Sequence, residues 1–381
     1  GARKAVFIRG LPEMHIKNIQ LSNLMIISNE GVQVEEADQI SIKKSTIISN
    51  PAMPILTVSN GTNIEIDTIA LKKSHPVASS YFEKMAATAM YLWPDSFSVK
   101  PGGKARWSYD QGVILKGIEN AWKLTGDASY FNYIQHCMDY YIQEDGTILD
   151  YKGSDFNLDH LNNGKILLLL YQVTGKDKYK KALTSLKNQL NQQPKNEEGG
   201  YWHKKIYPNQ MWLDGLYMGA AFNAQYAAVM HDTAAFDDIT HQFILAEKYT
   251  RNPTTGLLYH AWDQSKSQKW ANPITGQSPY VWGRAMGWYG VALVDALSFY
   301  PKNHPGKDSL VQILKRYVQA IVKVQDSKSG IWLDILDAPL AEKNYFEASA
   351  SSMFVTVLFK AVRNGYIDHS YIAAAEKGYA G

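Results

Sequence analysis

The first 74 residues alternate apolar and polar positions, and this pattern repeats along the segment. Residues 14–37 align without a gap with residues 38–61, and Thr62 begins a third copy. Isoleucine dominates the apolar positions, and Asn-Glu-Gly, Asn-Pro and Asn-Gly-Thr interrupt them, which is typical of short strands joined by turns. A repeat in the low twenties without a helix favours coils of a right-handed parallel β-helix over a small meander sheet. Because so few coils cannot cover their own ends, we expect the segment to contact the next domain or residues absent from this chain.

From Val77 onward the apolar positions recur about every 3.6 residues, which predicts helices. The segment 72–76, which ends in His-Pro, is the natural boundary, so we predict domains at 1–74 and 77–381. No strand is expected among the helices. The helices are predicted at 79–92, 109–124, 128–142, 158–173, 178–192, 212–229, 234–250, 282–299, 309–324 and 348–364, with a last one starting near His369.

A chain of consecutive helices favours helical hairpins arranged in a ring, a mainly α (α/α)6 barrel. The pattern predicts one helix fewer than the twelve that six hairpins need. We therefore expect either that the last helix lies beyond Gly381 or that the pattern hides one helix. The long loops between hairpins collect aromatic residues, His and Asp, and such loops on one rim are the expected place of function. They are 97–108, 150–157, 196–209, 253–280 and 331–346.

Composition and charge exclude several classes of function. The net charge of +3 over 381 residues is interspersed and has no basic run, so no nucleic-acid partner is expected. No stretch is long and apolar enough to span a membrane, and a signal peptide is absent or already removed. The single cysteine, Cys137, rules out an internal disulfide, and HExxH, GxSxG, P-loop and GxGxxG motifs are absent, so no metal or cofactor is expected. The 24 Tyr and 10 Trp suit a sugar pocket, but also a large helical core.

One acidic residue, Asp214, lies in the aromatic stretch YWHKKIYPNQMWLDGLY at 201–217. Apolar neighbours such as Trp212 are expected to raise the pKa of its carboxyl group, as a general acid requires. The alternative is that Asp214 is the N-cap of the helix that follows, because helix N-caps favour Asp. The residues alone leave the two interpretations about even.

Four further segments could contribute to a site. Asp159, in LDHLNNGK, is a candidate carboxylate or a residue that only starts a helix, and His260 lies in LLYHAWDQS. Arg284 and Trp288, in YVWGRAMGWYG, share a helical face, where a guanidinium could hold the carboxylate of an anionic sugar and an indole could hold its ring. The alternative for that pair is a cation–π contact on the surface. Glu347, in YFEASASSMF, is a weaker candidate that helix capping could explain.

The order DHLNNG, His203, WLDGLYM, LYHAWD, WGRAMGW and FEASASSMF resembles glycoside hydrolase family 105, the unsaturated rhamnogalacturonyl hydrolases, over residues 77–381. The unsaturated glucuronyl hydrolases of family 88 are similar. Ala348 and Ala350 stand where many family members have Thr and Gly. Residues 1–74 resemble the last coils of polygalacturonase-like β-helix enzymes but lack their paired catalytic aspartates, so no chemistry is assigned to them.

The family resemblance implies an oligosaccharide substrate and hydration of its C4=C5 enol ether. It implies that Asp214 is the general acid/base and Asp159 a second essential carboxylate, which could raise the pKa of Asp214 by repulsion. Arg284 would hold the substrate carboxylate at some distance from Asp214. The residues predicted to bind substrate are His203, Trp212, Met218, His260, Arg284 and Trp288, together with Tyr109.

Two other functions remain open from the sequence. One is an inverting glycosidase that acts on saturated uronides with Asp159 and Asp214 as acid and base. The other is a pectin-binding module without catalysis. The compartment is unknown, and the fused β-helix segment gives only a slight preference for an exported or periplasmic protein.

Overall fold

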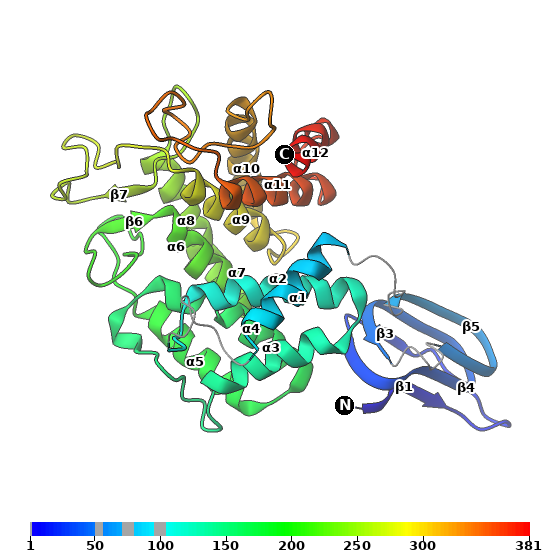
Figure 1. Ribbon diagram of the computed structural model, residues 1–381. Helices are drawn as coiled ribbons and strands as arrows, with labels where there is room; N and C mark the ends of the chain where they lie inside the picture. Colours follow the sequence, from blue (N-terminus) through cyan, green and yellow to red (C-terminus); the bar gives the residue numbers. More distant parts are fainter. Residues whose placement is uncertain (1, 50–55, 71–79, 95–103) are drawn as a thin grey trace. The chain divides into compact units, whose positions relative to one another are not determined.

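The computed structural model describes residues 2–49, 56–70, 80–94 and 104–381 (Figure 1). It divides into two compact units. The first unit comprises residues 1–150 and 169–182, and the second comprises residues 151–168 and 183–381. The boundary predicted at 72–76 lies outside the described residues, so the division into domains at 1–74 and 77–381 stays a prediction.

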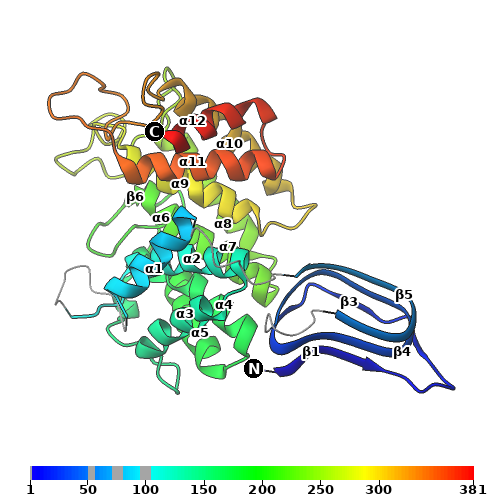
Figure 2. The same ribbon diagram turned by 45° about the vertical axis from the view of Figure 1, so that its right-hand side comes forward.

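The N-terminal strands of the first unit pair in parallel, and β4 is the strand to which all the others are bonded. Val34 of β4 pairs with Val58 of β5, and Ile40 pairs with Ile64, which is the offset of the sequence repeat. The strands lie side by side as curved ribbons (Figure 2). Parallel pairing rules out a meander, whereas the β-helix assignment stays a prediction. The strands are β1 (Ala2–Arg9), β2 (Ile16–Lys17), β3 (Gln20–Ser22), β4 (Met25–Ile48) and β5 (Leu56–Ala70).

The repeated isoleucines form a small core of this sheet. Ile40 and Ile42 are fully buried, and Ile8, Val32 and Val34 join the same apolar cluster. Alternation along a strand sends every second side chain to the same face, so the sequence pattern alone places these residues together.

The rest of the described chain is mainly helical, as predicted. The first unit contains α1 (Tyr81–Leu92), α2 (Tyr109–Thr125) and α3 (Ala128–Tyr141), and residues of both units occur in α4 (Gly164–Thr174) and α5 (Asp177–Asn191). The second unit contains α6 (Leu213–Gly215), α7 (Ala221–Met230), α8 (Ala235–Thr250), α9 (Gly283–Leu297), α10 (Pro305–Lys323), α11 (Ala348–Arg363) and α12 (Ile372–Ala380). Within it α9 packs on α11, and α8 packs on α10 (Figure 1).

Two predicted helices differ from the expectation at the positions that carry candidate residues. The helix predicted from Leu158 begins with a separate 3₁₀ turn, η2 (Leu158–Leu161), before α4. The helix predicted at 212–229 is divided by a π-helical turn, η3 (Leu216–Ala220), between α6 and α7. Such irregular turns within helices are frequent at functional sites.

A short antiparallel pair of strands corrects the expectation that no strand occurs among the helices. β6 (Gln210–Trp212) pairs with β7 (Ala261–Asp263), with Met211 opposite Trp262. Strands of three residues are too short to show a period of two, and their pairing joins distant parts of the chain. β6 leads directly into α6, so this pairing positions the site described below.

Candidate active site

Asp214 lies at the beginning of a helix but is not its cap. Trp212, the last residue of β6, is the N-cap of α6, and Asp214 is the second residue after it. The interpretation of Asp214 as an N-cap is therefore wrong by two positions. Its side chain is 14% exposed, so the carboxylate is nearly buried but can still be reached.

His260 is the partner of Asp214. Its Nε2 lies 3.1 Å from Oδ2 of the carboxylate. The sheet pairing fixes this approach, because the Leu213 N–H donates to the His260 carbonyl at 3.0 Å. The imidazole also contacts Trp212 and Trp282 edge to face, with ring centroids 5.0 and 5.1 Å away. Backbone pairing and two indole rings thus hold the histidine against the carboxylate.

The pKa of Asp214 lies below its ordinary value, which contradicts the expectation of a raised pKa. Burial alone would raise this pKa, but the hydrogen bond and charge of His260, together with the charge of His203, outweigh burial. In the free protein Asp214 is therefore ionised near neutral pH.

Asp159 forms a second pair of a carboxylate with a histidine. Asn157 caps the turn η2 by accepting from the Asp159 N–H at 3.1 Å, so the Asp159 carboxylate is not used for capping. Instead it lies 2.7 Å from Nζ of Lys204 and 3.4 Å from Nε2 of His203. Lys204 offsets the charge of Asp159, so the prediction that Asp159 raises the pKa of Asp214 is not met.

Trp212 connects the two pairs. The ring of His203 stacks on it in parallel at 4.6 Å, while His260 contacts it edge to face. Tyr207 also stacks on it, at 4.9 Å. His203 is buried, and burial lowers its pKa although Asp159 and Asp214 act in the opposite direction. Trp212 and the two carboxylate–histidine pairs, five predicted site residues in all, therefore form one cluster.

A cavity of about 340 Å³ adjoins this cluster. Trp212 and His260 belong to its wall, together with residues that the sequence motifs do not single out: Ala261, Trp270, Ser278, Pro279, Tyr280, Trp282 and Ile335. Several of them come from the long loops 253–280 and 331–346, which were predicted to be functional. Tyr280 and Trp282 also lie in YVWGRAMGWYG, the segment of Arg284 and Trp288.

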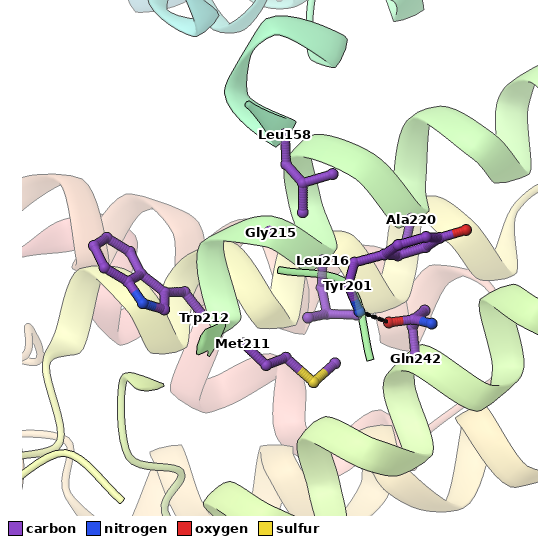
Figure 3. Close-up of a pocket in the computed structure, with 8 residues that line it drawn as sticks. All are labelled: Leu158, Tyr201, Met211, Trp212, Gly215, Leu216, Ala220 and Gln242. Carbon is purple, nitrogen blue, oxygen red and sulfur yellow. Dashed lines mark hydrogen bonds between the residues drawn. The ribbon is translucent and has the colours of Figure 1, made fainter. Parts of the chain in front are cut away.

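A much smaller pocket of about 10 Å³ lies beside the start of α6, and it is too small for a sugar (Figure 3). It is lined by Leu158, Tyr201, Met211, Trp212, Gly215, Leu216, Ala220 and Gln242. A Cβ at Gly215 would come within 3.0 Å of Leu158 and 3.2 Å of His203. This close packing next to Asp214 explains why a glycine follows the carboxylate.

Arg284 lies at the start of α9 beside the cavity wall. Its Nη1 donates to Oε1 of Glu347 at 2.9 Å, and its guanidinium lies 4.5 Å from the ring centre of Trp282. Glu347 is itself the N-cap of α11, as the sequence allowed. Arg284 thus makes a cation–π contact, as the alternative predicted, but with Trp282 and not with Trp288. The ring of Trp288 packs on that of Tyr217, with centroids 4.7 Å apart.

Two predicted residues of the second unit, Met218 and Trp288, do not line the cavity. Met218 is buried in η3, and Trp288 contacts Tyr217. Tyr109 begins α2, a helix of the first unit. Their roles in substrate binding stay predictions.

Over the described residues, no group of three or more His, Cys, Asp or Glu side chains is arranged to hold a metal ion. None of the helices in the described ranges is long and apolar enough to cross a membrane.

Comparison with known proteins decides the family. The model of Glycosyl Hydrolase Family 88 matches residues 81–381. The chain belongs to this family. The family 88 chain is 31% identical over 261 residues to "Unsaturated rhamnogalacturonyl hydrolase YesR" of Bacillus subtilis (strain 168), covering 67% of this chain and 71% of that protein.

Solved structures confirm the fold. A family 105 glycoside hydrolase of C. acetobutylicum ATCC 824 is 46% identical, with a TM-score of 0.75 over 79% of this family 88 chain and 82% of that chain. A possible family 105 member from Salmonella enterica is 24% identical, with a TM-score of 0.66 over 81% of this chain and 82% of that chain. This likeness supports the fold alone. The predicted resemblance to family 105, the (α/α) barrel and the assignment as a glycoside hydrolase are thus confirmed.

Proposed function

We propose that this family 88 hydrolase removes the unsaturated (Δ4,5) galacturonyl residue from the non-reducing end of pectin-lyase products such as unsaturated rhamnogalacturonan disaccharide. The observation that carries the proposal is the Asp214–His260 pair, because His260 forms part of the wall of a cavity large enough for a sugar residue. The similarity to YesR, a protein named for this activity, supports the choice of substrate.

The reaction is hydration of an enol ether, and one carboxyl group suffices for it. Protonated Asp214 gives its proton to C4, and positive charge develops at C5 and the ring oxygen. Water attacks C5, and the carboxylate takes a proton from that water, which restores the acid. The C5 hemiketal then opens to a ketone, and the resulting hemiacetal at C1 expels the leaving sugar. The net change is the addition of one water molecule.

Asp214 must be protonated for the first step, although it is ionised in the free protein. Substrate binding supplies two effects that raise its pKa: it displaces water from the cavity, and it brings a second negative charge, the uronate carboxylate. His260 lies 3.1 Å away and can exchange a proton with the carboxylate. We therefore assign the acid/base role to Asp214 and the role of its proton partner to His260.

Arg284 holds the uronate carboxylate in this proposal. A guanidinium has five N–H donors, and the bond to Glu347 uses one of them. Its side chain is 38% exposed and lies over the ring of Trp282, which is part of the cavity wall. The indoles of Trp212 and Trp282 provide apolar surfaces for the sugar ring.

The test compares two substrates with the intact chain. An unsaturated galacturonyl-rhamnose disaccharide should lose its enol-ether absorbance and release rhamnose, whereas the saturated galacturonyl-rhamnose disaccharide should remain intact. Absence of any absorbance loss would overturn the proposal. Comparable cleavage of the saturated disaccharide would instead support an ordinary inverting glycosidase, and an unsaturated glucuronyl disaccharide measured in parallel shows which uronyl group is preferred.

A further inference from the structure

A second cavity, of about 220 Å³, adjoins the cavity next to His260. The two cavities share Trp270, Ser278 and Pro279 in their walls. The half-buried indole of Trp270 therefore belongs to both. The proposed acid/base chemistry uses only the first of these cavities.

The two cavities differ in the character of their walls. The first is mostly aromatic, with Trp212, Trp282 and Tyr280. The second is mostly polar, and its wall contains Asn272 and Gln277 in addition to the shared residues. One apolar ring face surrounded by hydrogen-bonding side chains is the combination that suits a sugar residue.

The loop that carries Trp270 is held firmly at its base. The carboxylate of Asp263 is fully buried and accepts from the backbone N–H groups of Ser265, Ser267 and Gln268, each at 3.0 Å. The loop returns at Gly276, whose carbonyl accepts from the Asp263 N–H at 2.9 Å.

Only a glycine fits at position 276, where the loop returns to Asp263. Its φ of +79° is one that other residues rarely adopt, and a Cβ there would lie 2.3 Å from the Asp263 carbonyl oxygen. Next to it, Trp262 of β7 stacks on Tyr249 of α8 with ring centroids 3.8 Å apart. The loop is thus a preformed wall that needs little ordering when a ligand binds.

We propose that the second cavity is a subsite for the sugar residues that follow the leaving sugar, with Trp270 as the platform between the two subsites. This inference rests on the proposed function. It implies that the enzyme prefers oligosaccharides longer than a disaccharide. It also gives Asp263 the role of a positioning residue for the loop.

The test measures kcat/KM for an unsaturated rhamnogalacturonan tetrasaccharide and for the corresponding disaccharide. Trp270→Ala should lower the value for the tetrasaccharide about tenfold more than the value for the disaccharide, because one aromatic contact is lost. Trp270→Phe should retain most of the preference. Ile274→Ala is the matched control, because Ile274 lies on the same loop, is 80% exposed and lines neither cavity.

Binding of the leaving trisaccharide, which lacks the unsaturated residue, is measured in parallel by calorimetry. It should bind to the intact chain and to Ile274→Ala, and about tenfold more weakly to Trp270→Ala. Equal loss for both substrates, or trisaccharide binding that does not depend on Trp270, would overturn the subsite while leaving the proposed function intact. If the intact chain leaves both unsaturated substrates unchanged, the proposed function fails, and the binding measurement still decides whether the cavity holds a sugar.

Discussion

The two carboxylates of the site look alike but have different surroundings. Asp214 and Asp159 are 14% and 15% exposed, and each faces Nε2 of a histidine, at 3.1 and 3.4 Å respectively. Asp159, however, also binds Lys204 at 2.7 Å. Its histidine, His203, is almost completely buried, whereas His260 forms part of the cavity wall.

This difference separates a reacting group from a supporting one. The carboxylate of Asp159 is fixed by the ion pair with Lys204 and by the buried His203. A carboxylate paired only with an accessible histidine can gain and lose a proton as substrate binds. We therefore propose that Asp214 transfers the proton and that Asp159 positions His203 and Trp212.

The largest effect is expected for Asp214→Asn. An amide of the same shape cannot give a proton to C4, so kcat should fall on the order of ten-thousandfold. The measurement is the rate of absorbance loss with the unsaturated disaccharide, and circular dichroism checks that the variant is folded. Activity within tenfold of the intact chain would assign the acid to another group.

A smaller loss, of about a hundredfold, is expected for Asp159→Asn, because the change displaces His203 and Trp212 without removing the acid. The double variant Asp159→Asn/Lys204→Met tests whether Asp159 only positions its neighbours. The double variant should be more active than Asp159→Asn alone, since it does not leave the ammonium group unpaired. A loss equal to that of Asp214→Asn, without any recovery in the double variant, would make Asp159 a reacting group as well.

His260→Gln should change the pH dependence. Burial raises the pKa of Asp214, and His260 opposes burial more strongly than His203 does, so removing His260 raises this pKa. Because the reaction needs protonated Asp214, the alkaline limb of kcat/KM should move to higher pH. A limb that stays in place or moves to lower pH would contradict the pairing. His241→Gln, an exposed histidine of α8, is the control and should leave the limb unchanged.

The smallest effect is expected for Glu347→Gln. The amide still accepts hydrogen bonds at the start of α11 but loses the ion pair with Arg284, so KM should rise about threefold with kcat unchanged. Arg284→Lys, which removes the planar fork, should raise KM more. A change in kcat without a change in KM would show that Arg284 does not bind the ground-state substrate.

The sequence predicted the helices well because their apolar periodicity is local and extends over many residues. It did not predict β6 and β7, since three-residue strands have no recognisable period and depend on pairing between Met211 and Trp262. The irregular turns η2 and η3 were also missed. They follow from tertiary packing such as that of Leu158 against Gly215.

The site was only partly predictable for the same reason. The motifs identified Asp214, Asp159, His203, Trp212 and His260, all of which meet in the structure. The low pKa of Asp214 depends on His260, which approaches only through the pairing of β6 with β7. Trp270 belongs to no periodic pattern, so only the folded loop shows that it faces two cavities.

One measurement tests the central claim most directly: absorbance at the enol-ether band and release of the leaving sugar are followed together after mixing the intact chain with the unsaturated disaccharide. If Asp214 protonates C4 first, the absorbance falls before or together with the appearance of rhamnose. If rhamnose appears while the absorbance persists, the glycosidic bond breaks before the double bond is hydrated, and the account is contradicted.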